Sequence, residues 1–197
     1  MKLTIERAAL LKSLGHVQSV VERRNTIPIL SNVLIEAKGD RVSLTATDMD
    51  LAIVEHTAAE VAGAGAATVP AHMLYDIVRK LPEGAQVQLE LAGDGSQVAI
   101  KAGRSRFTLQ TLPKEDFPST ASGDLPHRFP LSAVDLRSLI DHTRFAISTE
   151  ETRYYLNGIY LHAHSSGKQQ ALRAVATDGH RLARVEMPLP EGLEKNP

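Results

Sequence analysis

The sequence lacks cysteine and tryptophan and has few aromatic residues, and each shortage excludes a class of function. Without cysteine there is no disulfide, no thiolate ligand for a metal and no thiol nucleophile, which fits a reducing compartment such as the cytoplasm. Aromatic residues make up only 4% of the chain, so platforms that stack single-stranded bases must be few. Chemistry that depends on thiols or on broad aromatic surfaces is therefore not expected.

An excess of charge and a long apolar run are also missing. The 197 residues include 22 Lys+Arg and 23 Asp+Glu, a net charge of -1 at pH 7, so binding of a polyanion would require local placement of charge. No run of about 18 apolar residues occurs, and Glu6, Arg7 and Lys12 interrupt the amino-terminal stretch. We expect a globular cytoplasmic protein that neither spans a membrane nor carries an ordinary export signal.

Two segments, 44–56 and 174–187, repeat one pattern. They read LTATDMDLAIVEH and AVATDGHRLARVEM, and both contain Ala-Thr-Asp, Leu-Ala and Val-Glu in the same order. Apolar residues at helical spacing precede each copy, over 7–21 and over 132–147, and the second helix has a serine and an aspartate at the positions of a capping box. A short strand is predicted before each helix, and alternating strands after it.

A third copy of this unit lies between the other two. Its predicted helix, over 71–81, is stopped by Pro82 and Gly84 and is followed by three short strands. The chain therefore divides into three units of strand, helix and three strands, which begin near residues 1, 66 and 128. The segment 112–127, with three prolines, reads as a linker between domains.

This organisation predicts an α+β fold of duplicated β-α-β-β-β units. The two units of a domain would pack their helices on one face of an antiparallel sheet built from both. Residues 1–122 would form a first domain of two units, and residues 127–197 an incomplete second domain of one unit. We therefore expect the sequence to be part of a longer protein.

A resemblance to a known family is carried by seven stretches, which occur in the order NTIPILSNVLI, TATDMDLAI, VPAHMLYDIVRKLPEG, GRSRFTLQTLP, DFPS, RYYLNGIYL and AVATDGHRLA. Over nearly its whole length the chain resembles the bacterial DNA polymerase III beta subunit, the replicative sliding clamp. The resemblance implies a DNA-clamp fold with three domains per subunit, of which this sequence holds the first and about half of the second. It further implies two subunits joined head to tail in a ring around double-stranded DNA.

The function implied by the resemblance is that of a DNA polymerase processivity factor, which is not an enzyme and needs no cofactor. Its partners would be the DNA polymerase III alpha subunit, the clamp loader and repair polymerases, all bound through short linear motifs with Gln and spaced Leu or Phe residues. Local charge agrees with helices that face the DNA. The first two helices each carry one more basic than acidic residue, whereas segment 36–60 has six acidic residues against two basic ones.

The resemblance assigns DNA contact to Arg24, Tyr154 and Tyr155, which lie on predicted loops. His72 and Glu150 stand where some family members carry arginine and a neutral amide, so the strength of contact would differ here. From sequence alone, the two tyrosines are equally compatible with packing in a core.

A second set of residues is assigned by the resemblance to the cleft that binds linear motifs. Thr47-Asp48 is explained as a turn in which the aspartate binds nearby backbone, and the later copy is read as replacing Met49-Asp50 by Gly179-His180-Arg181, one residue longer. The glycine would let a peptide backbone approach, two leucines would form an apolar floor, and the histidine and arginine would add polar tips. The cleft residues are Arg153, Leu156, Thr177, Gly179, His180, Arg181 and Leu182.

The strand that contains Phe107 and Leu109, flanked by Arg104 and Arg106, is read as an edge strand with an apolar face. The resemblance makes this edge the contact with the other subunit. One more buried strand is the alternative from sequence alone.

Two other functions remain open at this level. A metal-dependent enzyme would use Asp48 and Asp50, or His162 and His164 together with His180, although neither set has a third ligand at a motif spacing. A scaffold of repeated units that does not bind DNA is the other possibility.

Overall fold

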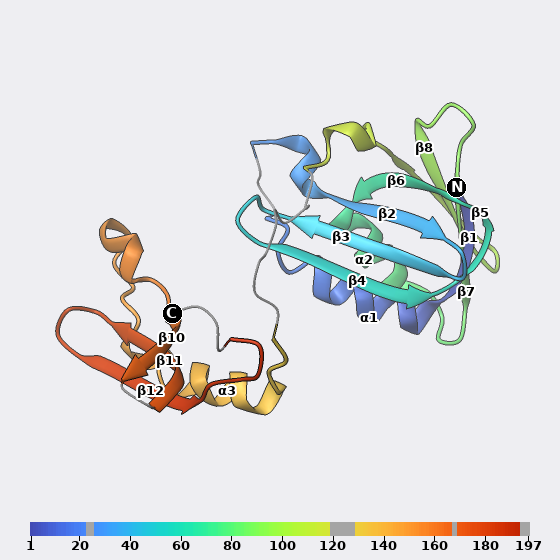
Figure 1. Cartoon of the computed structure of the whole chain (residues 1–197). Coiled ribbons are helices and arrows are strands. Elements are labelled where there is room, and N and C mark those ends of the chain that lie inside the picture. Colours follow the sequence, from blue (N-terminus) through green and yellow to red (C-terminus); the bar gives the residue numbers. More distant parts are fainter. Residues whose placement is uncertain (23–25, 119–128, 167–168, 194–197) are drawn as a thin grey trace. The chain divides into compact units, whose positions relative to one another are not determined.

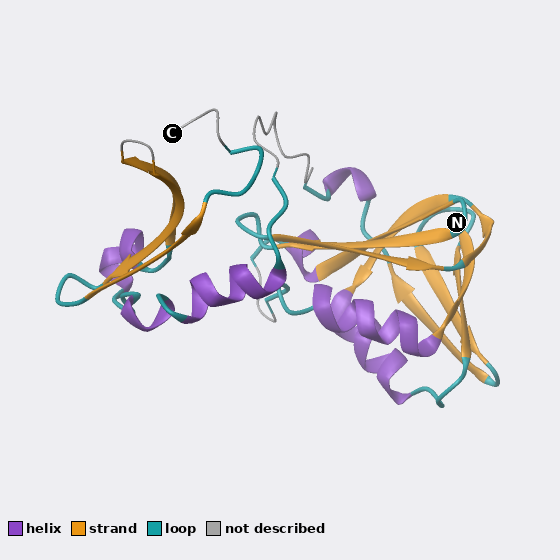
Figure 2. Cartoon of the chain, turned by 60° about the horizontal axis from the view of Figure 1, so that its bottom comes forward, coloured by secondary structure: helices purple, strands orange, loops and turns teal. Residues whose placement is uncertain are grey.

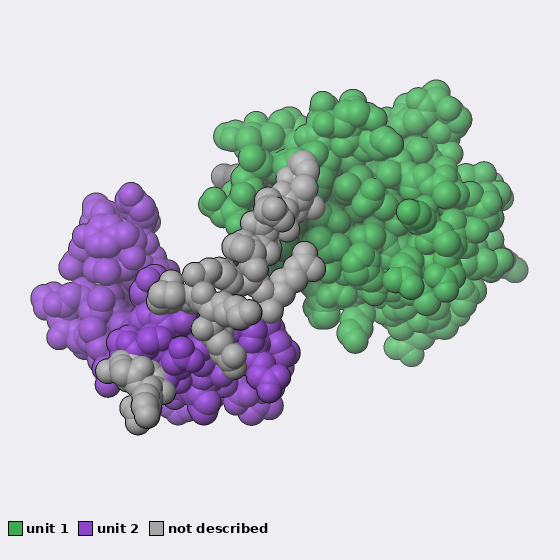
Figure 3. Space-filling view, viewed as in Figure 1, with its two compact units in different colours: residues 1–121 green, residues 122–197 purple. Residues whose placement is uncertain are grey.

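A computed structural model describes residues 1–22, 26–118, 129–166 and 169–193. The chain forms two compact units, Met1–Ala121 and Ser122–Pro197 (Figure 3). Arg24 lies outside the described residues, as do most of segment 112–127 and Gly167-Lys168 of the turn between two strands. Within the described ranges, none of the helices combines the length and apolar composition needed to cross a membrane.

Unit 1 contains two successive copies of the predicted β-α-β-β-β arrangement (Figure 1). An additional strand, β5, lies between them and is not predicted by the sequence pattern. The first copy comprises β1 (Lys2–Glu6), α1 (Arg7–Val17), β2 (Asn32–Lys38), β3 (Arg41–Thr47) and β4 (Ala52–Ala58), and is followed by β5 (Glu60–Gly63). The second comprises β6 (Gly65–Pro70), α2 (Ala71–Lys80), β7 (Gln86–Leu91), β8 (Gln97–Ala102) and β9 (Ser105–Gln110). Two 3-10 turns, Pro28–Ser31 and Lys114–Asp116, complete the unit.

The two copies exchange their first strands. One sheet has the order β5-β1-β7-β8-β9 and the other β4-β3-β2-β6, so β1 joins the strands of the second copy and β6 joins those of the first. Both exchanged strands are antiparallel to their new neighbours, with Leu3 opposite Leu89 and Val33 opposite Val69. The sequence predicts one sheet built from both copies, and the structure has two sheets that are each built from both.

Helices α1 and α2 lie side by side (Figure 2), and the bonds between their ends show that they run antiparallel. Arg7, at the start of α1, donates from Nε to Val78 O (3.2 Å) and from Nη2 to Arg79 O (2.7 Å), near the end of α2. His72, near the start of α2, binds Gln18 Oε1 through Nδ1 (2.9 Å) and Val21 O through Nε2 (2.8 Å), just beyond the end of α1. Each helix therefore holds the other at both ends, and the predicted side-by-side placement of 7–21 and 71–81 is confirmed.

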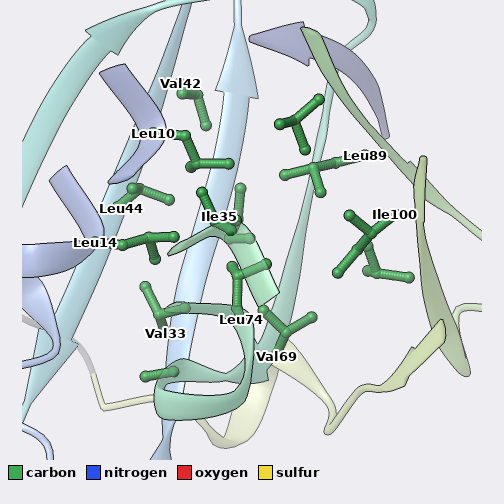
Figure 4. Close-up of a cluster of buried hydrophobic side chains, with 14 of the residues drawn as sticks. Leu10, Leu14, Val33, Ile35, Val42, Leu44, Val69, Leu74, Leu89 and Ile100 are labelled. Carbon is green, nitrogen blue, oxygen red and sulfur yellow. The ribbon is translucent and has the colours of Figure 1, made fainter. Parts of the chain in front are cut away.

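One apolar core fills the space between the helices and the two sheets. Leu10 and Leu14 of α1 meet Ile35 of the first copy and Leu74 of the second, and all four side chains are fully buried (Figure 4). The buried residues of α1 follow the 3.6-residue period of a helix, and the buried residues of the strands follow the two-residue period of a strand. Helix α1 ends at Val17, earlier than predicted, but Val20 and Val21 stay buried in the turn that follows.

The described part of unit 2 contains one α-helix and one sheet. Ser132 Oγ accepts from Asp135 N (3.0 Å), which is the N-cap bond of the predicted capping box. Asp135 Oδ2 accepts from the Ser132 hydroxyl (2.6 Å), whereas a full capping box has the carboxylate accept from the backbone N–H of the N-cap residue. The helix ends at Asp141, six residues before the predicted end, and a 3-10 turn follows it. The elements are α3 (Ala133–Asp141), 3-10 turns Arg144–Ala146 and Glu151–Leu156, and β10 (Tyr160–Ser166), β11 (Gln169–Thr177) and β12 (Leu182–Pro188) in the order β10-β11-β12.

Two expectations about segments between elements are wrong. Residues 129–132 do not form a strand before α3. Their counterpart in unit 1, β1, pairs with β5 and β7, and the described part of unit 2 has no counterpart of either strand. Segment 112–117 is not linker, because Thr68 Oγ1 donates to Leu112 O (2.7 Å) and Phe117 is buried against Ile29 and Leu30.

We predict that Leu74→Ala destabilises unit 1 by about 2–5 kcal/mol, because it opens a cavity where the two copies meet. Met73→Ala is the matched control: Met73 precedes Leu74 on α2 but is 54% exposed, and its change should stay within about 0.5 kcal/mol. Urea denaturation followed by circular dichroism measures both. Equal losses of stability in the two variants would contradict the packing described.

Candidate protein-binding and DNA-binding surfaces

The two Thr-Asp turns form the same hydrogen-bond network. In the turn between β3 and β4, Thr47 Oγ1 donates to Leu51 O (2.7 Å), and Asp48 Oδ1 accepts from Asp50 N (3.0 Å) and Leu51 N (2.7 Å). The turn between β11 and β12 repeats these bonds: Thr177 Oγ1 donates to Arg181 O (2.7 Å), and Asp178 Oδ1 accepts from His180 N (3.0 Å) and Arg181 N (2.9 Å). The structural role predicted for the aspartate is therefore found in both turns.

The later turn is not one residue longer. Thr47 pairs with Ala52 and Thr177 with Leu182, so each turn has four residues between its strands. Arg181 thus corresponds to Leu51, and the Val-Glu echo in the two sequences is out of step by one residue. The sequence comparison went wrong because it aligned identical letters, whereas the hydrogen bonds fix the register.

Gly179 and Met49 occupy the same position in the two turns and share a left-handed backbone, with φ of 89° and 85°. The turn itself therefore requires this conformation, which glycine adopts without the steric penalty that a side chain incurs. A Cβ at Gly179 would also lie 3.1 Å from Arg153 Nη1, a contact closer than ordinary packing allows. Glycine at this position makes room for the arginine.

Arg153 links two segments of unit 2. Its Nε donates to Glu150 Oε2 (2.7 Å), Nη2 donates to Glu150 Oε1, and Nη1 reaches Asp178 O (3.3 Å) in the Thr-Asp turn. The backbone at Arg153 departs from helical geometry, with φ -112° and ψ 49°, which divides the 3-10 turn Glu151–Leu156. A bidentate ion pair of this kind fixes the guanidinium plane as well as its position.

Charges in this network shift the pKa of their partners. The hydrogen bonds from Arg153 lower the pKa of Glu150, and the Glu150 carboxylate raises the pKa of Arg153. Backbone N–H groups of Arg181 and His180, with a further bond from the Arg181 side chain, lower the pKa of Asp178 to about 2. All three groups are therefore charged at neutral pH.

Tyr154 and Tyr155 are carried on a loop whose base is closed by Ser148 N donating to Leu156 O (3.1 Å). The two rings meet edge to face, with centroids 5.9 Å apart, and are 79% and 70% exposed. Packing in a core, the alternative from sequence, is therefore wrong. Two rigid aromatic groups stand in solvent beside the Arg153 network.

A cavity of about 250 Å³ lies between this loop and the adjoining ends of β10 and β11. Leu156 and Thr177 line it together with Tyr155, Tyr160 and Val175. Leu182, on β12, is exposed and lies opposite Thr177 of β11. Arg181 Nε donates to Asp178 Oδ2 (2.8 Å), and Arg181 Cζ lies 5.9 Å from the centre of the Phe145 ring. The structure thus gathers the predicted cleft residues at one end of the sheet. Sequence reasoning missed Phe145, Tyr160 and Val175, because no local pattern shows that they reach this end.

The surface around β9 combines an open strand edge with an apolar groove. Strand β9 is the outermost strand of its sheet, and Arg104 and Arg106 are exposed on and beside it. Phe107 is 39% exposed and lines a groove of about 530 Å³ with Met73 and Ile77 of α2. Leu109 is 3% exposed and belongs to the core. Phe107 and Leu109 therefore lie on the same face of β9, but only Phe107 reaches solvent.

Neither metal site considered from the sequence is formed. Among the described residues, no three His, Cys, Asp or Glu side chains gather closely enough to hold a metal ion. One carboxylate oxygen of Asp48 already accepts two backbone N–H groups. His162 and His164 share a face of β10 with ring centres 6.5 Å apart, and burial lowers the pKa of His162.

Solved structures of sliding clamps share this arrangement. The crystal structure of the Caulobacter crescentus beta sliding clamp matches with 61% identity and a TM-score of 0.95, over 100% of this chain and 52% of that chain. The sliding clamp (DNA polymerase III subunit beta) of Bartonella birtlesii, solved bound to griselimycin, matches with 54% identity and a TM-score of 0.93, again over 100% and 52%. The fold is therefore that of the DNA clamps, as predicted.

The chain belongs to the DNA polymerase III beta subunit family. The N-terminal domain of that family matches residues 1–121, and its central domain matches residues 131–197. The beta sliding clamp of Caulobacter vibrioides is 62% identical over 192 residues, which are 98% of this chain and 52% of that protein. The chain spans about half the length of the curated relatives it matches.

We predict that Gly179→Ala destabilises unit 2 by about 1 kcal/mol or more and displaces Arg153, because alanine is strained at φ 89° and its Cβ meets the guanidinium. Gly158→Ala is the control, since a Cβ there meets no atom within 4 Å. Thermal unfolding and the NMR signal of the Arg153 Nε–H group report the two effects. An alanine at 179 that leaves both unchanged would refute this account of the turn.

We predict that the Asp178 carboxyl titrates with a midpoint near pH 2 instead of its usual 3.8. A folded-state pKa below the unfolded value means that the turn contributes stability above about pH 4 and loses it as the pH falls toward 2. Carbon-detected NMR of the side-chain carboxyl, assigned with Asp178→Asn, gives the midpoint. A value near 3.8 would show that the backbone N–H groups do not hold the carboxylate.

Proposed function

We propose that this chain is part of a sliding clamp, a ring that encircles duplex DNA and serves as a processivity factor for DNA polymerase. The observation that carries the proposal is the exchanged-strand, two-helix fold of unit 1 within a chain 62% identical to a beta sliding clamp. In this proposal, residues 1–122 are the first clamp domain and residues 127–197 are the first half of the second. The role is non-catalytic and uses no cofactor.

The DNA-facing set comprises Arg24, His72, Tyr154 and Tyr155. The exposed tyrosines support the proposal because they present aromatic edges and hydroxyl groups from a closed loop. His72 is included by position only, since its ring nitrogens already bind Gln18 and Val21, just beyond the end of α1. On the helix pair, Arg7 is bound by backbone carbonyls whereas Lys12 is exposed. Sparse cations suit a ring that slides, because strong phosphate contacts would fix its position.

The partner-binding cleft comprises Arg153, Leu156, Thr177, Gly179, His180, Arg181 and Leu182. Support comes from the cavity beside Leu156 and Thr177 and from the exposed Leu182 next to it, which together offer an apolar seat for a leucine or phenylalanine anchor. Arg153 and Arg181 supply fixed donors at the rim. The partners proposed are the DNA polymerase III alpha subunit, the clamp loader and repair polymerases, each through a linear motif.

The subunit contact comprises Arg104, Arg106, Phe107 and Leu109 in a head-to-tail dimer. The open edge of β9 and the groove beside Phe107 support it, because an added strand would satisfy backbone groups while an apolar side chain fills the groove. Leu109, which is buried, would hold β9 against the core and leave the direct contact to Phe107.

A chimera tests the proposal. The matching half of the Caulobacter vibrioides clamp is replaced by this chain, and the ring is assayed for retention on nicked circular DNA and for stimulation of a replicative polymerase. We expect both activities, because a working ring needs only this half to be equivalent. A chimera that dimerises but is not retained on circular DNA would overturn the proposal.

Variants of the chimera separate the two surfaces. Leu182→Asp should lower polymerase stimulation by about 30-fold, the effect of losing a central apolar contact of about 2 kcal/mol, while DNA retention is unchanged. Val54→Asp, at a 45% exposed position on β4, is the matched control and should keep both activities. Equal stimulation by all three rings would place the cleft elsewhere.

A further inference from the structure

One hydrogen bond joins the loop of the two exposed tyrosines to the Thr-Asp turn of unit 2. The loop is closed on itself by the bond from Ser148 N to Leu156 O (3.1 Å). Arg153 reaches out of the loop, and its Nη1 donates to Asp178 O (3.3 Å) in the turn. Among the described residues, no other hydrogen bond runs between this loop and this turn. The position of the Arg153 side chain therefore decides whether the two segments are linked.

Glu150 fixes the guanidinium group that makes this link. Its two carboxylate oxygens accept from Arg153 Nε and Nη2, which leaves Nη1 for Asp178 O. Each of the three guanidinium nitrogens therefore has its own acceptor. Because a planar guanidinium bound twice to one carboxylate has a single orientation, Glu150 directs Arg153 toward the turn.

The pair differs from an ordinary ion pair at the surface of this protein. On α2, Arg79 also follows its acidic partner, Asp76, by three residues, but it makes one bond of 3.2 Å and its side chain is 57% exposed. The Arg153 side chain is 31% exposed. Exposed single pairs contribute little to stability, since solvent screens them and two side chains must be ordered. The role of the Arg153 pair is therefore sought in what it positions.

The same pair offsets a positive charge beside the tyrosines. Arg153 immediately precedes Tyr154 and Tyr155, which are proposed to contact DNA. An unpaired arginine there would bind a phosphate and release a counterion, which strengthens DNA binding at low salt. Glu150 neutralises that charge and occupies two of the donors that a phosphate would take.

We propose that Glu150 is a positioning residue that directs the Arg153 guanidinium to the motif-binding cleft and withholds it from DNA. This inference rests on the proposed function, which assigns Arg153 to the cleft and the two tyrosines to DNA contact. Glu150 acts through Arg153 and touches neither ligand. Loss of its carboxylate should therefore strengthen the contact with phosphates and weaken the binding of a motif peptide. A purely structural role would instead impair both.

Glu150→Gln in the chimeric ring tests the proposal. For binding to a short linear duplex, the plot of log K against log salt concentration should become steeper by about 1, the contribution of one added arginine–phosphate contact. A fluorescent peptide with a glutamine and spaced leucine and phenylalanine residues should bind about fivefold more weakly, because the guanidinium is no longer held at the turn. An unchanged salt slope, or an unchanged peptide affinity, would each refute the proposal.

Glu151→Gln is the matched control. It removes the same charge one residue away, and the exposed Glu151 carboxylate pairs with no described residue. Both measurements should stay near those of the unaltered ring. In a ring that carries Arg153→Gln, Glu150→Gln should no longer change the salt slope, since no guanidinium is left to release. A change in slope in that ring would show that Glu150 acts on DNA directly, against the proposal.

The proposed function and the role of Glu150 fail in different ways. A chimera that is not retained on nicked circular DNA contradicts the sliding-clamp proposal, whatever Glu150 does. A chimera that is retained there, but in which Glu150→Gln and Glu151→Gln behave alike, contradicts only the role of Glu150.

Discussion

Pairing of backbone groups across two sequence repeats is the constraint on which the rest of unit 1 depends. Strand β1 has no partner among β2, β3 and β4 of its own repeat, and β6 has none among β7, β8 and β9. Strand β1 pairs with β7 of the other repeat and with β5 between the repeats, and β6 pairs with β2, so neither repeat can satisfy its strands alone. This exchange places α1 beside α2 and brings Leu10 and Leu74 into one core. Both repeats are therefore needed to pair all the strands of unit 1.

The Thr-Asp turn shows how one repeated structure acquires different roles. Thr47 and Thr177 make the same bonds, as do Asp48 and Asp178, so these bonds account for the chain reversal in both turns. The residues that follow the aspartate differ between the two turns, and Gly179 leaves room for the guanidinium of Arg153. That contact connects the turn to the loop of the two exposed tyrosines through Glu150. The same turn thus serves, in the later copy, as the rim of the proposed binding surface.

Periodicity in the sequence predicts the helices and most strands, because each signal lies within a single element. It does not predict β5, which is four residues long and depends on β1 as its neighbour. Nor does it predict that residues 129–132 form no strand, which follows from the lack of a neighbouring strand in the described part of unit 2. The exposed Tyr154 and the buried Leu109 illustrate the same limit at the candidate sites. Residues far away in the sequence decide whether an apolar side chain faces solvent. The register of Arg181 was predicted wrongly because identical residues in the two copies were aligned, whereas strand pairing fixes the register.

The burial of an apolar side chain accordingly depends on the element that packs against it and not on the sequence pattern alone. The fourth and eighth residues of α1 and of α3 are all large aliphatic side chains, and the strands beside them alternate alike, yet one set is sealed and the other open. Among the described residues, α1 and α3 therefore differ in what packs against them and not in their own sequence pattern.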